Sequence, residues 1–340
     1  MSRLLVTGAA GFIGSHVAEN LAEDGHEVIA VDNLSGGFLE NIPRGVTFVK
    51  SDVTHPDTVS RLFKEYGPFQ YVYHLAAYAA EGLSHYIRGF NYINNVVGSV
   101  NLLNESIRNS VECFVFTSSI AVYGTNQTPM HESLVPLPED PYGIAKYAVE
   151  LDLKAAHEMF GIDYIIFRPH NVYGERQNIA DRYRNVIGIF MNQILHGEPM
   201  TVFGDGTQTR AFSYIADVAP AIAQAPYIKK AQCKTFNIGA DTPYTVNDLV
   251  HLVAKAFDMT PEVRYLPARK EVVHAFCDHT LIRSVFQLAR PTPLSIGIKR
   301  MADWVKSIGP RQPIGFDSVE VDKNFPLGWR QYIASLKENR

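Results

Sequence analysis

The chain has 340 residues, of which 46% are hydrophobic and 19% are charged, and its formal net charge is −4. These proportions suit a globular protein with a substantial core, in one large domain or two moderate ones. The slightly acidic balance offers no electrostatic footprint for a polyanion, so we expect no nucleic-acid partner, although a few local donors suffice for a nucleotide. Glycines interrupt the apolar opening stretch, and no apolar run is long enough to span a membrane. We therefore expect no signal peptide, no membrane partner and a cytoplasmic protein.

The cysteines and histidines show no metal-ligand spacing in the sequence. Cys113, Cys233 and Cys277 are odd in number and far apart, so they form neither a disulfide framework nor a zinc pattern. We expect them to be buried in a reducing compartment. His74 and His170 lie close to the strongest motifs of the chain, and we expect both to pack structurally. No metal is predicted.

The first half alternates short β-branched runs with amphipathic stretches. Helices are expected at Phe12–Glu23 and Asp57–Tyr66. The expected strands are Leu4–Thr7, Glu27–Val31, Thr47–Lys50, Tyr71–Leu75, Phe114–Thr117 and Tyr164–Arg168. This alternation predicts an α/β fold, a Rossmann doubly wound parallel sheet with helices on both faces and right-handed crossovers.

After about residue 170, the alternation of expected strands and helices becomes less regular. Short strands are expected at 200–204 and 235–239, and helices near 185–195, 247–257 and 293–307. We predict a Rossmann domain over residues 1–170, to which segments near 212–240 return, and a smaller C-terminal α/β lobe over residues 171–340. No linker marks the boundary, and the tail from 309 to 340 has no assignment.

The strongest motif is the glycine triplet Gly8, Gly11 and Gly14, which directly follows a predicted strand and opens a helix. Such glycines allow a tight turn and a close approach to a pyrophosphate, which the helix N-terminus then attracts. Asp32 ends the next strand, eighteen residues after Gly14, near the spacing at which an acid binds the adenosine ribose. Its charge would repel the 2′-phosphate of NADP, so the motif predicts NAD.

Two later strands end in residues that fit the same pocket. Asp52 follows the third strand, where a carboxylate can meet the adenine amino group. Ala76 and Ala77 follow the fourth strand, where small side chains leave room for the cofactor. Each position alone says little.

Tyr142 and Lys146 are four residues apart at the start of a predicted helix and therefore share a face. An ammonium near a phenol lowers the pKa of the phenol, which makes the tyrosine a usable base near neutral pH. The segment follows a strand that runs into Ser119, at the sheet edge where open α/β folds bind ligands. A serine hydroxyl there can hold a reacting oxygen.

From residue 4 to about residue 307, the sequence resembles the extended short-chain dehydrogenases/reductases, specifically the nucleotide-sugar epimerases and dehydratases. The motifs that carry the resemblance are Gly8-x-x-Gly11-x-x-Gly14, Val31-Asp32-Asn33, His74-Leu-Ala-Ala77, Asn94-Asn95-Val-x-Gly98, Thr117-Ser-Ser119, Tyr142-x-x-x-Lys146 and Arg168-Pro-His-Asn171-Val-Tyr-Gly174.

The resemblance implies a catalytic triad of Ser119, Tyr142 and Lys146. It implies that Asn95 supports the cofactor and the triad, and that the backbone of Pro169 and His170 faces the nicotinamide amide. The residues expected to contact NAD are Gly8, Gly11, Phe12, Ile13, Gly14, Asp32, Asn33, Asp52, Val53, Leu75, Ala76, Ala77, Asn95, Thr117, Tyr142, Lys146, Pro169 and His170.

The resemblance also implies that the C-terminal lobe mainly binds a nucleotide-diphosphate sugar, with a UDP-sugar favoured. Asn171 would contact the diphosphate, and Arg210 would clamp it with a rigid guanidinium fork. The residues expected to bind the substrate are Ser119, Tyr142, Asn171, Asn185, Val186, Val202, Phe203, Arg210, Arg269, Glu271 and Asp278.

The residues after Ser119 bear on the reaction type. Related 4,6-dehydratases carry Asp-Glu at the positions of Ile120 and Ala121, and decarboxylating relatives tend to keep a glutamate at the second. Neither side chain here can move a proton, so we predict reversible epimerisation at C4 through a 4-keto intermediate. A dehydratase, a decarboxylase or a ketoreductase is the alternative enzyme, and an NAD(H)-sensing protein without activity is the other class.

Three features depart from the family pattern, and a fourth leaves the assembly open. The stretch Tyr78–Leu83, which touches the sugar in relatives, has an unfamiliar sequence, and Ala211 stands where an acid is usual. Arg269 lies one position from the usual second phosphate-binding arginine. Apolar residues recur at helical period over Asn91–Ile107; relatives build a homodimer with this helix, although packing within one monomer explains the pattern equally well.

Overall fold

A seven-stranded parallel sheet forms the centre of the computed structural model, which describes residues 2–125, 128–181, 183, 185–268, 274–312, 316, 319–326 and 329–330. In spatial order its strands are β11 (Lys234–Ile238), β6 (Asp163–Pro169), β5 (Cys113–Thr117), β4 (Tyr71–His74), β1 (Arg3–Thr7), β2 (Glu27–Asp32) and β3 (Thr47–Lys50). The chain runs outward from β1 to β3 and then returns to β4 on the other side of β1. The predicted Rossmann fold is confirmed, and its strand order reverses between β1 and β4, where open α/β sheets bind ligands.

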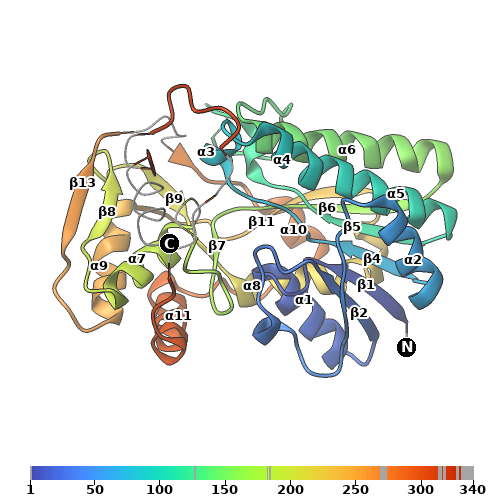
Figure 1. The fold of residues 1–340 in the computed structure, drawn as a ribbon, viewed down its shortest axis with the longest axis horizontal. Coiled ribbons are helices and arrows are strands. Elements are labelled where there is room, and N and C mark those ends of the chain that lie inside the picture. The colour runs from blue at the N-terminus through green and yellow to red at the C-terminus, as the bar shows by residue number, and fades with distance from the viewer. Residues whose placement is uncertain are drawn as a thin grey trace.

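The central strands are mainly apolar and are buried along nearly their whole length, because both faces of the sheet are covered. Along β1, Leu4 and Val6 belong to the apolar cluster on one face, and Leu5 belongs to the cluster on the other. One face is covered by α1 (Phe12–Glu23) and α8 (Ile215–Gln224), and the other by α2 (Pro56–Tyr66), α5 (Gly98–Arg108) and α6 (Pro141–Phe160) (Figure 1).

The helical run before β5 contains one irregular turn. It begins as α4 (Arg88–Tyr92), widens to a π-helical turn over Ile93–Val97 and continues as α5. Such turns are frequent at functional sites. Asn95 lies within the turn and is 1% exposed. A further short helix, α3 (Glu81–Ser84), precedes the run.

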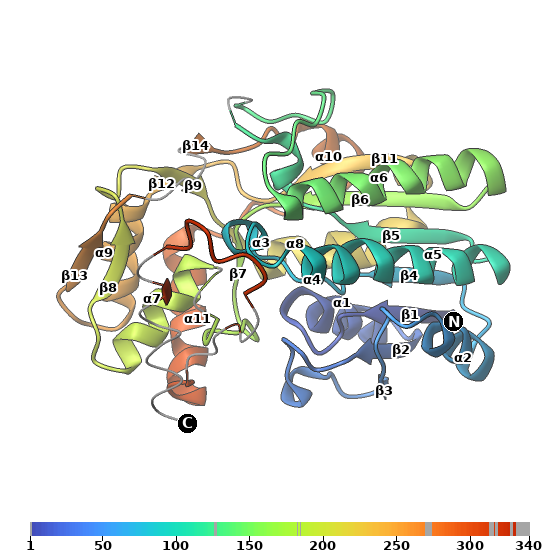
Figure 2. The ribbon, with the colours of Figure 1, turned by 45° about the horizontal axis from the view of Figure 1, so that its top comes forward.

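The C-terminal lobe is built from three longer helices and several short strand pairs (Figure 2). The helices are α7 (Val186–Leu195), α9 (Val246–Ala256) and α11 (Leu294–Ile308), with the short α10 (Thr280–Val285). The pairs are β8 (Met200–Phe203) with β13 (Val263–Leu266), β9 (Thr209–Ala211) with β12 (Pro243–Thr245) and β14 (His274–Ala275), and β7 (Val172–Tyr173) with β10 (Ser213–Tyr214).

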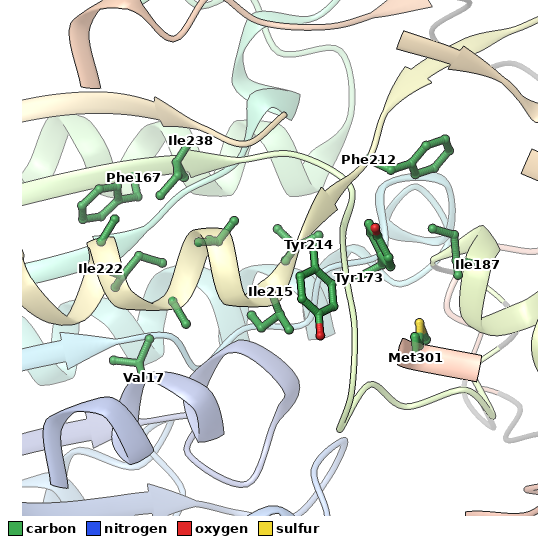
Figure 3. Packing of buried hydrophobic residues seen from close by; sticks show 14 of the residues in the cluster. Val17, Phe167, Tyr173, Ile187, Phe212, Tyr214, Ile215, Ile222, Ile238 and Met301 are labelled. Carbon is green, nitrogen blue, oxygen red and sulfur yellow. The ribbon is translucent and has the colours of Figure 1, made fainter. Parts of the chain in front are cut away.

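The sheet and the lobe share one hydrophobic core. α8 and β11 return to the Rossmann sheet after the chain has entered the lobe. Figure 3 shows buried side chains that run from Val17 of α1 through Ile222 of α8 to Ile187 of α7 and Met301 of α11. The chain therefore crosses between the two parts several times. Among the described residues, no helix has the length and apolar character that a membrane span requires.

His74, the last residue of β4, joins three elements of the Rossmann half. Its Nδ1 lies 2.8 Å from Thr7 Oγ1, and its Nε2 lies 2.8 Å from Ser99 Oγ. The ring is fully buried, and this burial lowers its pKa from 6.5 to about 3. The imidazole is therefore neutral at physiological pH and has the structural role that its sequence position indicates.

We expect His74 to make the fold sensitive to acid. Because the folded protein keeps the ring neutral, the unfolded chain binds more protons as the pH falls below 6.5. The stability contributed by this residue is complete above pH 6.5 and is lost toward pH 3, by up to about 1.4 kcal/mol per pH unit. Urea unfolding between pH 7 and pH 5 should show a shallower loss in His74→Gln than in the wild type. The exposed His251→Gln is the control, and a slope unchanged in His74→Gln would contradict this assignment.

Candidate active site

The turn between β1 and α1 is shaped for a close backbone approach. Gly8 has a φ of 71°, and a Cβ atom there would lie 2.7 Å from the backbone nitrogen of Ala76. A Cβ atom on Gly14 would lie 2.1 Å from the Gly8 carbonyl oxygen. Both positions therefore require glycine. Gly11 is the N-cap of α1 and makes no side-chain cap hydrogen bond, so the positive end of that helix can receive a pyrophosphate.

Two carboxylates follow the ends of β2 and β3. Asp32 is 9% exposed, and it accepts hydrogen bonds from Ala10 N at 3.1 Å and Leu34 N at 2.7 Å. Burial raises its pKa, and the backbone N–H groups oppose that rise. At Asp52, burial acts in the same direction, but hydrogen bonds from Thr54 and Asn33 outweigh it and lower the pKa. Asn33 Nδ2 donates to Asp52 Oδ2 at 3.0 Å, so the segment after β2 and the segment after β3 are hydrogen-bonded to each other.

Ser119, Tyr142 and Lys146 lie at the C-terminal end of β5 and the start of α6. Ser119 is 8% exposed, and its Oγ accepts a hydrogen bond from Ala121 N. Asp140 caps α6 by accepting from Gly143 N, which sets Tyr142 and Lys146 on the first two turns. The Lys146 ammonium lies 5.9 Å from the centre of the Tyr142 ring and donates to the Thr117 carbonyl at 2.8 Å.

The Lys146 ammonium is poised near neutral pH. Its burial lowers the pKa from 10.5 to about 7, and Glu150, one helical turn further on, opposes that fall. Glu150 in turn is held by Arg168 and by Ser118 Oγ at 2.5 Å. A lysine with this pKa can hold or release a proton beside the tyrosine without a large free-energy cost.

Asn95 connects the segment after β4 to the start of α6. Its amide accepts from Tyr78 N at 2.9 Å and donates to Tyr78 O at 3.0 Å and to Asn91 Oδ1 at 2.8 Å. Asn91 Nδ2 donates to the Pro141 carbonyl at 2.9 Å. A buried amide relay therefore runs from Asn95 through Asn91 to Pro141, the residue that precedes Tyr142.

The end of β6 carries Pro169, His170 and Asn171. Asn171 has a φ of 40° and donates to the Ala211 carbonyl at 3.1 Å. His170 Nδ1 lies 3.1 Å from the same carbonyl oxygen, and burial lowers the pKa of its ring to about 3. The His170 side chain is therefore neutral and already hydrogen-bonded within the protein. The backbone of this turn remains the part that we expect to face the cofactor.

His170 also lies in a group of possible metal ligands that the sequence spacing did not reveal. One ligand atom each from His170, Cys277 and His279 lies within 4.8 Å of the others. The two Nε2 atoms are 3.1 Å apart, and burial raises the pKa of the Cys277 thiol. A histidine–histidine hydrogen bond with a neutral thiol accounts for this contact without an ion. The prediction that no metal binds stays a prediction.

The predicted substrate residues come from separate elements of the lobe. Asn185 has a φ of 67°, precedes α7 and donates to the Val172 carbonyl at 2.7 Å. Arg210 lies on β9, and Asp278 binds Thr280 at the start of α10. Arg269 and Glu271 lie outside the described residues.

The β8 strand refines one part of the prediction. The Val202 side chain is 1% exposed and lies in the hydrophobic core, whereas the next residue, Phe203, is half-buried. Because alternate side chains of a strand face opposite ways, the Val202 side chain packs into the core and the Phe203 side chain points away from it. Val186, which opens α7, is also half-buried.

Known proteins are similar to most of this chain. The profile described as the NAD-dependent epimerase/dehydratase family matches residues 4–239. A Methanocaldococcus jannaschii protein named putative UDP-glucose 4-epimerase is 35% identical, over 89% of this chain and 98% of its own. The crystal structure of UDP-glucose 4-epimerase with UDP-glucose from Thermotoga maritima has 36% identity and a TM-score of 0.84, over 90% of this chain and 99% of that one. UDP-glucuronic acid 4-epimerase from Bacillus cereus, in complex with UDP-glucuronic acid and NAD, has 28% identity and a TM-score of 0.82, with the same coverage.

The position of Asp32 leads to a test of cofactor choice. Asp32→Asn removes the negative charge and keeps the shape, so NADP should gain on NAD by on the order of tenfold or more in relative affinity. Titration of apoprotein with both cofactors measures the ratio, and the exposed Asp24→Asn is the control. Equal affinity of the wild-type protein for NAD and NADP would overturn the role of Asp32.

Proposed function

The chain belongs to the NAD-dependent epimerase/dehydratase family, and on that premise we propose that it inverts C4 of a nucleotide-diphosphate sugar, with a UDP-sugar as the first candidate. The family match confirms the predicted family and the predicted NAD-dependent enzyme. The observation that carries the proposal is the arrangement of Ser119, Tyr142 and Lys146 beside a glycine-lined turn, in a chain similar over nine-tenths of its length to enzymes named 4-epimerases.

The residues around the turn fit NAD. Gly8 and Gly14 leave room for a pyrophosphate, the N-terminus of α1 attracts its charge, and Asp32 stands where ribose hydroxyls can donate to a carboxylate. NAD⁺ held by these residues would supply a reversible hydride acceptor and would end the reaction in the state in which it began.

The chain itself supplies the proton transfers and the orientation. The Tyr142 phenolate removes the proton from the sugar 4-hydroxyl. After the 4-keto sugar has rotated in the site, the tyrosine returns a proton. The Lys146 ammonium favours the phenolate by its positive charge, and Ser119 Oγ holds the reacting oxygen. Asn171 and Arg210 hold the diphosphate, so remote binding energy retains the intermediate.

The alternative reactions need an acid that the segment after Ser119 lacks. Ile120 and Ala121 form a 3-10 turn, and Ile120 is 9% exposed. Elimination of water and loss of carbon dioxide both require further proton transfers that these side chains cannot make. Epimerisation uses the tyrosine alone as acid and base, and for this reason we prefer it to dehydration, decarboxylation or net reduction.

We further propose a homodimer that works in the cytoplasm, with NAD held mainly by residues 1–170 and the nucleotide sugar mainly by residues 171–340. Exposed apolar side chains on the π-helical turn before α5 and on α6 support the dimer. They are Ile93, Val97, Ile144 and Leu151, which are 41–51% exposed. The free cysteines support a reducing compartment.

Replacement of the base tests the triad. Tyr142→Phe should lower turnover by on the order of 10²-fold or more, because it removes the proton acceptor. Binding of the nucleotide sugar, measured by calorimetry, should persist because the proposed clamp lies on other elements. Tyr147→Phe, on the same helix, is the matched control. Near wild-type turnover in Tyr142→Phe would show that another group is the base.

The fate of the hydride tests the reaction type. A substrate deuterated at C4 should give a product of equal mass that still carries deuterium at C4, even in ordinary water, because the hydride returns to the carbon it left. A dehydratase would move the deuterium to C6, and a decarboxylase would release carbon dioxide. Mass spectrometry and NMR of the products distinguish these outcomes. Either alternative result would require an acid from another segment, with Glu81 in α3 as the first residue to test.

A further inference from the structure

The C-terminal segment packs on the stretch between β4 and α5. We use "the strap" for its described residues, 316, 319–326 and 329–330. Figures 1 and 2 both show this red segment beside α3. The stretch supplies Ala80, Leu83 and Ile87, the strap supplies Phe325 and Trp329, and Tyr183 from the segment before α7 completes this separate cluster of buried side chains.

One strap carboxylate binds the start of α4. Glu320 Oε2 accepts from Gly89 N at 2.6 Å, and its Oε1 accepts from Phe90 N at 2.8 Å. The backbone N–H groups of Glu320 and Val321 donate to the Tyr86 carbonyl at 2.8 and 3.2 Å. A carboxylate at a helix N-terminus forms charge-assisted hydrogen bonds, which are about twice as strong as neutral ones.

Two glycines in this stretch match two strap side chains. A Cβ atom on Gly89 would lie 3.2 Å from both Glu320 carboxylate oxygens, and one on Gly82 would lie 3.3 Å from the Trp329 ring. The stretch therefore has no side chain at the two positions where Glu320 and Trp329 approach its backbone. Two independent contacts, one charged and one aromatic, fix the strap against the same eight-residue span, 82–89.

The same stretch holds the N-terminus of α6. Ser84 Oγ accepts a hydrogen bond from Tyr142 N at 3.2 Å. Asn91 Nδ2 donates to the Pro141 carbonyl at 2.9 Å. Ser84 is two residues from the glycine under Trp329, and Asn91 is two residues from the glycine under Glu320. Contacts therefore run from the strap through this stretch to the backbone of the proposed base.

We propose that the strap positions Tyr142, with Glu320 and Trp329 as positioning residues that act through Ser84 and Asn91. This inference rests on the proposed function only in naming Tyr142 as the base. It gives the C-terminal segment a role in turnover, although none of its described residues belongs to the triad. A strap that only covered apolar surface would contribute to stability and leave the geometry of Tyr142 unchanged.

Glu320→Gln in the full-length protein is the first test. The amide keeps one acceptor and turns its NH₂ group toward the other backbone N–H, so one of the two bonds is lost. We expect kcat to fall by on the order of tenfold, with NAD affinity unchanged and the amide protons of Gly89, Phe90 and Tyr142 exchanging faster. Asp322→Asn is the matched control, because the contacts of Asp322 are made by its carbonyl. Glu320→Asp should restore part of the lost kcat.

Gly89→Ala is a second, independent perturbation, because its methyl group would push against the same carboxylate. A double-mutant cycle of Glu320→Gln with Ser84→Ala should be non-additive if both act on Tyr142 by one route. Wild-type kcat in both Glu320→Gln and Gly89→Ala, with faster exchange at Gly89 and Phe90 but not at Tyr142, would overturn the proposal. The exchange measurement needs no turnover, so it decides the role of the strap even if the enzyme acts on another substrate.

Discussion

The buried ion pair between Glu150 of α6 and Arg168 of β6 is the interaction on which the site depends. The Glu150 side chain is fully buried and that of Arg168 is 3% exposed, and the two form paired hydrogen bonds of 2.9 and 2.5 Å. Removal of one partner from such a pair leaves an uncompensated buried charge and costs about 3–5 kcal/mol. The pair fixes α6 against the sheet, and it also places a negative charge one helical turn from Lys146. One contact therefore holds the triad helix in place and opposes the fall that burial causes in the pKa of its lysine.

The dinucleotide half could be read from the sequence because its signals are local. Fully buried parallel strands appear in the sequence as continuous apolar runs. The turn at Gly8 can be recognised because its backbone requires glycine at Gly8 and Gly14. The helix α8 was not predicted, since Pro220 in its interior normally argues against a helix. The lobe's strands β7, β9, β10, β12 and β14 have only two or three residues, too few to show a period.

The parts of the site that the sequence did not predict depend on contacts between distant segments. Ser84 lies 58 positions before Tyr142, and Glu320 lies 231 positions after Gly89, so no motif or spacing connects them. Gly82 and Gly89 are visible in the sequence, but only the folded chain shows that each lies against a side chain of the strap. Similarly, Val202 fitted the family pattern, but its burial shows that the side chain serves the core.

The continuous core between sheet and lobe has a consequence for how the two ligands affect each other (Figure 3). Because α8 packs against α1 on one side and leads into the lobe on the other, neither half can loosen without exposing apolar surface of its neighbour. A change of order that a ligand imposed on the lobe would therefore reach the cofactor half, and the converse effect would be equal, since linkage between two binding sites is reciprocal. The two halves loosen or tighten together, so the molecule responds to either ligand as one thermodynamic body.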